Sequence, residues 1–393
     1  MRILITNPTN WPLVRRGVER FMNELAAWLA RRGHDVTVLS AHPGRKTVVR
    51  DKGFVTVMHR RLWRPWMERH GILEFHMFFF TVLAEVLRRR WDVVVSCTFM
   101  DAFAVNLARP LTGTPSVFWV NALPPRITYF RSRSLKGKVF ASAMRGANGV
   151  VALSDYMQKN LAERFGRGGD IIPAPVDLEN FRLNTERDTS KVVILCTAAL
   201  DDRRKGGKLL MRAFNAIKVR WLDAILRISC RLTEEDRVSL LSHVEERWRN
   251  DVEFPGPGSL SDLSGLLGSA TVTVLASRWE AFGMVVVESL ATGTPVAATR
   301  DGALPEILDD PAVGRLFDPG PETEPEPVNL EGLIEAIFAC IELSRDPATP
   351  ERCRKHAQRY GWDVIGPRIE EMIASAAHPG VGRKASDRAA ASL

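Results

Sequence analysis

The chain has 393 residues and a formal net charge of +8, with 45% hydrophobic and 25% charged residues. This composition is typical of a globular protein, and it excludes a fully disordered chain, a collagen-like repeat and a bundle of membrane-spanning helices. The length predicts two domains, because one hydrophobic core rarely serves a chain of this size.

Basic residues are concentrated in the first part of the chain. Residues 1–180 contain 27 Lys and Arg and 14 Asp and Glu, a net charge of +13, whereas residues 181–393 have a net charge of −5. A surface of this kind could bind nucleic acid, an anionic membrane or an anionic small molecule, or it could carry solvated charge only. No nucleic-acid recognition motif accompanies the charge, so we expect no nucleic-acid partner.

The five cysteines are scattered, and no two have CxxC spacing. We therefore expect neither a disulfide framework nor a zinc site, and a reducing cytoplasm is the expected compartment. Arg2 is followed directly by a strand pattern, which is not the pattern of a signal peptide.

Short apolar runs alternate with longer amphipathic segments along most of the chain. A buried strand is predicted at 2–6, and apolar residues at helical spacing predict a helix over 17–32 that ends at Gly33. Further strands are predicted at 36–39, 93–96, 116–120 and 149–153. This alternation is typical of βαβ units around a parallel sheet.

The alternation begins again after a proline-containing segment at 171–181, which we interpret as an interdomain linker. Strands are predicted at 192–197, 224–229 and 272–275, and helices at 208–217, 234–248 and 285–291. We therefore predict an α/β fold with two tandem Rossmann-like domains facing a cleft. The tail from 378 to 393 is rich in Ala, Ser, Gly and charge and is predicted to be disordered.

The loop after the first predicted strand ends at Arg16-Gly17 and has no GxGxxG motif, so a nicotinamide cofactor is not expected. Gly17 opens a helix, which would let an anion approach the N–H groups at the positive helix end. The alternative is that Gly17 only ends a flexible loop.

The segment with the strongest chemical signal joins the strand 272–275 to the next helix and reads SRWEAFGMVVVE. Glu280 lies in the turn before the helix, and Glu288 lies about one turn inside it. Phe282, Gly283 and Met284 would present unpaired backbone N–H groups at the helix N-terminus. Two carboxylates beside such a helix end can bind a polyhydroxyl group together with its diphosphate.

This segment, with its Glu-x7-Glu spacing, resembles the donor-site signature of the family 4 retaining glycosyltransferases of group 1 type, which have the GT-B fold. Other segments agree with that family in the same order along most of the chain. They are GVERFMNEL at 17–25, RGHDVTVLS at 32–40, VVALSDYM with Ser154, IPAPVDLENF at 172–181, LDDRRKGGKLL with Lys205, and Trp362-Asp363.

The resemblance implies a hexosyltransferase-type enzyme that uses a UDP- or GDP-linked sugar and transfers it, with retention, to a lipid-linked or small-molecule acceptor. No other cofactor is implied, and no metal is required, because the chain has no Asp-x-Asp. The implied domains are an acceptor-binding domain at 1–175, a nucleotide-sugar-binding domain at 176–360 and a helix at 361–377 that returns to the first domain.

The resemblance also assigns roles to individual residues. Glu280 would hold sugar hydroxyls, Glu288 the ribose and Lys205 the diphosphate, with Gly17 supplying N–H groups from the other domain. The implied catalytic residues are Glu280, Asn121 and Lys205. The implied donor-binding residues are Arg16, Gly17, Arg203, Arg204, Lys205, Glu280, Ala281, Phe282, Gly283, Met284 and Glu288.

Three positions depart from the family pattern. Ala199 stands where the family has an arginine, Asn121 where it has a histidine, and Arg16 where it has the first glycine of a pair. We predict that Arg203 or Arg204 replaces the lost arginine. The alternative function is a catalytically inactive relative that binds a nucleotide or glycan as a partner.

A cluster of arginine and tryptophan follows residue 59 in the basic part of the chain. This mixture is typical of a contact with a membrane surface. It predicts a cytoplasmic protein attached peripherally to the inner face of the cell membrane; the alternatives are an ordinary surface loop and a soluble acceptor. The cluster consists of Arg60, Arg61, Trp63, Arg64 and Trp66.

Overall fold

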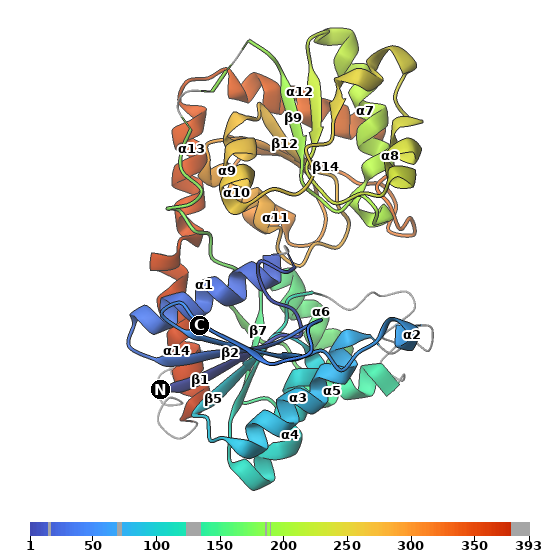
Figure 1. The fold of residues 1–393 in the computed structure, drawn as a ribbon. Helices are drawn as coiled ribbons and strands as arrows, with labels where there is room; N and C mark the ends of the chain where they lie inside the picture. Colours follow the sequence, from blue (N-terminus) through green and yellow to red (C-terminus); the bar gives the residue numbers. More distant parts are fainter. Residues whose placement is uncertain (15–16, 69–72, 123–134, 185–186, 189, 379–393) are drawn as a thin grey trace. The chain divides into compact units, whose positions relative to one another are not determined.

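The computed structural model describes residues 1–14, 17–68, 73–122, 135–184, 187–188 and 190–378. It divides into two compact units, each with its own sheet of mainly parallel strands (Figure 1). Unit 1 comprises Met1–Pro173 and the chain from Ile365 onward, and unit 2 comprises Ala174–Val364. The tail predicted to be disordered lies outside the described residues, apart from His378.

In unit 1, the described strands form an eight-stranded sheet in the order β3-β4-β2-β1-β5-β6-β7-β8. Every neighbouring pair is parallel except β3 and β4, which are antiparallel. The inner strands are buried on both faces, as expected for a sheet covered by helices. The strands are β1 (Arg2–Thr6), β2 (Asp35–His42), β3 (Val48–Asp51), β4 (Val55–Arg60), β5 (Val93–Ser96), β6 (Ser116–Trp119), β7 (Gly149–Ala152) and β8 (Asp170–Ile171).

The helices of unit 1 include one from the far end of the chain. Helices α3, α4 and α5 pack side by side (Figure 1). Gly366 of α14 lies against the ring of Trp28 in α1, which leaves no room there for a side chain. The helices are α1 (Gly17–Arg31), α2 (Pro65–Glu68), α3 (Glu74–Arg88), α4 (Phe99–Thr112), α5 (Leu135–Gly146), α6 (Asp155–Phe165) and α14 (Trp362–Ala377).

Unit 2 has a six-stranded parallel sheet in the order β11-β10-β9-β12-β13-β14. Its strands are β9 (Val193–Cys196), β10 (Ile225–Ile228), β11 (Val252–Glu253), β12 (Val272–Leu275), β13 (Val296–Thr299) and β14 (Gly314–Phe317). Its α-helices are α7 (Gly207–Arg220), α8 (Glu234–Leu241), α9 (Leu260–Ser269), α10 (Met284–Ala291), α11 (Leu304–Ile307), α12 (Leu330–Ser344) and α13 (Thr349–Ala357). The 3-10 helices are η1 (Arg203–Lys205), η2 (Glu246–Asp251) and η3 (Gln358–Tyr360).

The helix predicted over 234–248 is wrong in its second part, because α8 ends at Leu241. The side chain of Asn215 in α7 binds the backbone just beyond that end. Its Nδ2 donates to the His243 carbonyl at 3.0 Å, and its Oδ1 accepts from the Glu245 N–H at 2.9 Å. These bonds satisfy backbone groups outside a helix, so a turn replaces the helical continuation.

Candidate functional site

Two turns meet at the carboxyl edge of the unit 2 sheet. One follows β9 and carries η1, and the other follows β12 and leads into α10. Strands β9 and β12 are direct neighbours in the sheet. Ligands of open α/β sheets bind at this edge, in the crevice beyond the strand ends.

Lys205 and Glu280 face each other across these turns. The Lys205 Nζ lies 2.5 Å from the Glu280 Oε1, and the two side chains are 21% and 16% exposed. The structure thus brings together two residues that the sequence analysis chose separately. Because both remain partly accessible, they offer one cation and one carboxylate to the same small volume.

The N-terminus of α10 begins beside Glu280. Gly283 precedes the helix with a φ of 105°, and no side chain caps it. The N–H of Val286 donates to the Gly283 carbonyl at 2.9 Å, and the N–H groups of Gly283 and Met284 lie ahead of it at the positive end of the helix. The ring of Phe282 is buried against Tyr360 with centroids 5.7 Å apart, which anchors the backbone from Ala281 to Met284. Glu288 is buried inside the helix.

Arg203 and Arg204 bind carboxylates in this structure. The Arg203 guanidinium lies 2.7 Å from the Glu326 carboxylate, and that of Arg204 lies 2.6 Å from Asp202. Contact between either arginine and a diphosphate would require exchange of its present partner. Their replacement of the arginine lost at Ala199 stays a prediction.

The remaining predicted site residues belong to unit 1. Gly17 is the first residue of α1. Asn121 follows β6, and its Nδ2 donates to the carbonyls of Cys97 at 3.1 Å and Trp119 at 3.2 Å. Arg16 lies outside the described residues.

Unit 1 contains two buried carboxylates that were not predicted as site residues from the sequence. Asp101 lies in the first turn of α4 with no exposed surface, and it accepts a hydrogen bond from the Thr6 hydroxyl at 3.1 Å. Burial raises its pKa to about 7. Glu19 in α1 is also buried and accepts from the Thr9 hydroxyl at 2.6 Å. The apolar neighbours of Asp101 in CTFMDAFAV were a signal that its carboxyl is buried.

Asp101 should make stability depend on pH. Between its ordinary value of 3.8 and about 7, the folded state binds a proton that the unfolded state does not. Stability from this group is therefore complete below pH 3.8 and falls as the pH rises toward 7, by at most about 1.4 kcal/mol per pH unit. Asp101→Asn should remove this trend, so that the variant gains stability relative to the wild type from pH 5 to pH 8. Urea unfolding of both proteins at pH 5 and pH 8 measures their free energies of unfolding. If the difference between the two proteins is the same at both pH values, the prediction is wrong.

The arginine and tryptophan cluster is only partly open to solvent. Arg61 binds Glu74 at 2.6 Å, and Arg64 donates to the carbonyls of Arg61 at 2.7 Å and Trp63 at 2.9 Å. Arg60 is exposed, and Trp66 is 59% exposed. Of the predicted contact residues, Arg60 and Trp66 are thus the most available.

Among the described residues, no group of three or more His, Cys, Asp or Glu could hold a metal ion. No helix in the described ranges is long and apolar enough to cross a membrane. The five cysteines are buried and form no disulfide.

The chain is similar to several known proteins. It is 26% identical to the D-inositol 3-phosphate glycosyltransferase of Corynebacterium kroppenstedtii, over 57% of this chain and 52% of that protein, so the match spans about half of the relative. It is 22% identical to the phosphatidyl-myo-inositol mannosyltransferase of Propionibacterium freudenreichii, over 91% and 90%. The crystal structure of Anabaena HepE with UDP and glucose has a similar fold, with a TM-score of 0.74, 18% identity and coverage of 95% and 100%.

Family matches cover most of the chain. Residues 15–180 match the glycosyltransferase family 4, and residues 177–338 match the glycosyl transferases group 1. The two parallel sheets agree with the predicted GT-B fold. The chain therefore belongs to the GT-B glycosyltransferases, with a family 4 N-terminal part and a group 1 C-terminal part.

Proposed function

We propose that the protein is a retaining glycosyltransferase that moves a hexosyl group from a UDP- or GDP-linked donor to a phosphorylated or lipid-linked acceptor. The observation that carries the proposal is the Lys205–Glu280 pair beside the open N-terminus of α10. Family membership and the inositol-directed relatives support it.

The donor would lie at the carboxyl edge of the unit 2 sheet. As the bond to the sugar breaks, negative charge develops on the nucleoside diphosphate. Lys205 and the N–H groups of Gly283 and Met284 would stabilise that charge. Glu280 would accept hydrogen bonds from sugar hydroxyls, and Glu288 would bind the ribose. These roles of Lys205, Glu280 and Glu288 do not require a metal ion. The anomeric configuration would be retained if the acceptor attacks the sugar from the same face that the diphosphate leaves.

The acceptor would bind unit 1. Two relatives carry names that specify acceptors, inositol 3-phosphate in one and phosphatidyl-myo-inositol in the other. Both acceptors combine a polyol with a phosphate, which suits the excess of basic residues in this part of the chain. Asn121 would orient the acceptor through its side-chain amide.

The proposed activity is tested by incubating the protein with UDP-glucose, UDP-galactose, UDP-N-acetylglucosamine, GDP-mannose and candidate acceptors. We expect acceptor-dependent release of free nucleoside diphosphate, and an axial anomeric linkage in the product from an α-linked donor. Nucleotide binding without turnover of any donor would favour the alternative, a catalytically inactive relative. The alanine at position 199 and the binding of Arg203 and Arg204 to carboxylates are the observations that favour this alternative.

A membrane-bound acceptor predicts reversible binding to anionic lipid. Each basic side chain near such a surface contributes about 1 kcal/mol, and tryptophan adds apolar burial. Arg60→Glu combined with Trp66→Ala should therefore reduce co-sedimentation with phosphatidylglycerol vesicles at low salt. Arg231→Glu, an exposed arginine of unit 2, is the charge-matched control. If the wild type does not sediment even at low salt, the prediction of membrane binding is wrong and a soluble acceptor remains as the alternative.

A further inference from the structure

We propose that Arg278 and Asp301 are positioning residues that hold the turn carrying Glu280. The inference rests on the proposed function, in which Glu280 contacts the donor sugar. Neither residue was chosen as a site residue from the sequence. Arg278 is 1% exposed, so it acts through its neighbours and not by touching the donor.

The turn contains an unfavourable backbone conformation. Trp279, directly before Glu280, has a φ of 57°. Among the described residues, it is the only one other than glycine with a positive φ. Residues other than glycine rarely have a positive φ, and contacts with the surrounding structure must hold them in that conformation. The backbone N–H of Trp279 donates to the Asp301 Oδ1 at 2.9 Å.

Asp301 is in turn fixed by Arg278. The Asp301 Oδ2 lies 3.4 Å from the Arg278 Nη1. The Nη2 of the same guanidinium shares its two N–H groups among three successive carbonyls in the loop after β14, those of Pro319, Gly320 and Pro321, at 3.2, 2.9 and 2.8 Å. A buried guanidinium with this many partners has little freedom, so the carboxylate that it binds is also held in one place.

The contacts continue on both sides of the Lys205–Glu280 pair. The N–H of Ala303 donates to the Glu280 carbonyl at 3.0 Å. Gly302 lies so close that an added Cβ would be 2.4 Å from the same oxygen. On the other side, the N–H of Arg278 donates to the carbonyl of Arg204, next to Lys205, at 2.8 Å. One residue, Arg278, thus connects the turn of Glu280 with the segment of Lys205.

This arrangement predicts a specific pattern of kinetic change. Loss of the carboxylate at 301 should release Trp279 from its positive φ and move Glu280, while the contacts of Lys205 with a diphosphate remain available. The effect should therefore fall on kcat for a sugar nucleotide, with little change in the affinity for the free nucleoside diphosphate.

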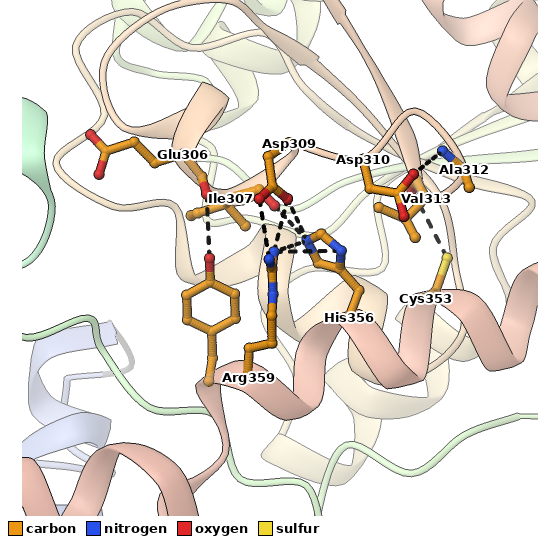
Figure 2. Close-up of polar contacts among 10 residues, drawn as sticks. Glu306, Ile307, Asp309, Asp310, Ala312, Val313, Cys353, His356 and Arg359 are labelled. Atoms are coloured by element: carbon orange, nitrogen blue, oxygen red, sulfur yellow. Dashed lines mark hydrogen bonds and ion pairs between the residues drawn. The ribbon is translucent and has the colours of Figure 1, made fainter.

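The experiment compares Asp301→Ala, Asp301→Asn and a control, Arg359→Gln. Asparagine keeps an acceptor for the Trp279 N–H but lacks the charge. Arg359 also forms an arginine–aspartate pair in unit 2, with Asp309 at 2.9 Å, and its Nη2 lies 2.6 Å from the His356 Nε2 (Figure 2). Figure 2 shows that this second network links the end of α13 and the residues after it to the loop that follows α11.

With the donor that the wild type consumes, Asp301→Ala should lower kcat by about 10- to 100-fold and change the Kd for UDP or GDP by less than about 3-fold. Asp301→Asn should retain most of kcat. Arg359→Gln should lower the thermal midpoint without lowering kcat. A wild-type kcat in Asp301→Ala, or equal losses in the Asn and Ala variants, would overturn the proposal.

Crystal structures of the wild type and Asp301→Ala separate this inference from the proposed function. We expect Trp279 to leave its positive φ and the Lys205–Glu280 contact to be lost in the variant. An unchanged turn would overturn the inference even in an active enzyme. If the wild type consumes none of the sugar nucleotides, the proposed function fails, and the comparison of the two structures still decides whether Asp301 holds the turn.

Discussion

Glu280→Gln is expected to reduce kcat by about 10- to 1000-fold while leaving the fold intact, the range typical for loss of one polar contact to a transition state. The amide has nearly the shape of the carboxylate but no charge. It would accept weaker hydrogen bonds from sugar hydroxyls and would lose the ion pair with Lys205. Steady-state kinetics with the active sugar nucleotide, together with circular dichroism of the variant, measure this effect.

The matched control is Glu351→Gln, which neutralises an exposed carboxylate of unit 2 in α13. It should have the kinetics of the wild type. An unchanged kcat/KM in Glu280→Gln would remove Glu280 from the donor site and, with it, the observation on which the proposed function depends.

Lys205→Ala should weaken donor binding and slow turnover together, because a diphosphate needs a cation both before and after the bond to the sugar breaks. Charge-assisted hydrogen bonds contribute about 1.5–3 kcal/mol, which corresponds to roughly 10- to 150-fold in affinity. The Glu280 carboxylate would also lose its partner and repel the diphosphate. Isothermal titration with UDP and GDP measures the loss directly.

Lys208→Ala is the control for this variant, because Lys208 is exposed in the first turn of α7, three residues from Lys205. It should bind nucleotide as the wild type does. An affinity of Lys205→Ala equal to that of Lys208→Ala would contradict the assignment. Replacing Arg203 and Arg204 together with alanine tests whether either arginine also reaches the diphosphate, and an unchanged affinity would show that neither does.

The two parallel sheets were predictable because their strands are short, buried on both faces and separated by amphipathic helices. Strands 2–6, 93–96 and 272–275 agree with the structure at both ends. A strand of this kind is apolar throughout, so hydrophobicity alone identifies it. The antiparallel pairing of β3 with β4 was not predicted, since exposed Val49, Arg50 and Asp51 give β3 no apolar run.

The family resemblance, the fold class and the candidate donor residues could be predicted from the sequence, because functional side chains are concentrated in the turns that follow strands. Which of these side chains contact one another depends on the folded chain. Lys205 and Glu280 pair because β9 and β12 are neighbours in the sheet, although two further strands separate them along the chain. In the same way, Asp301 after β13 reaches Trp279 after β12. Such contacts depend on strand order, which local sequence patterns do not contain.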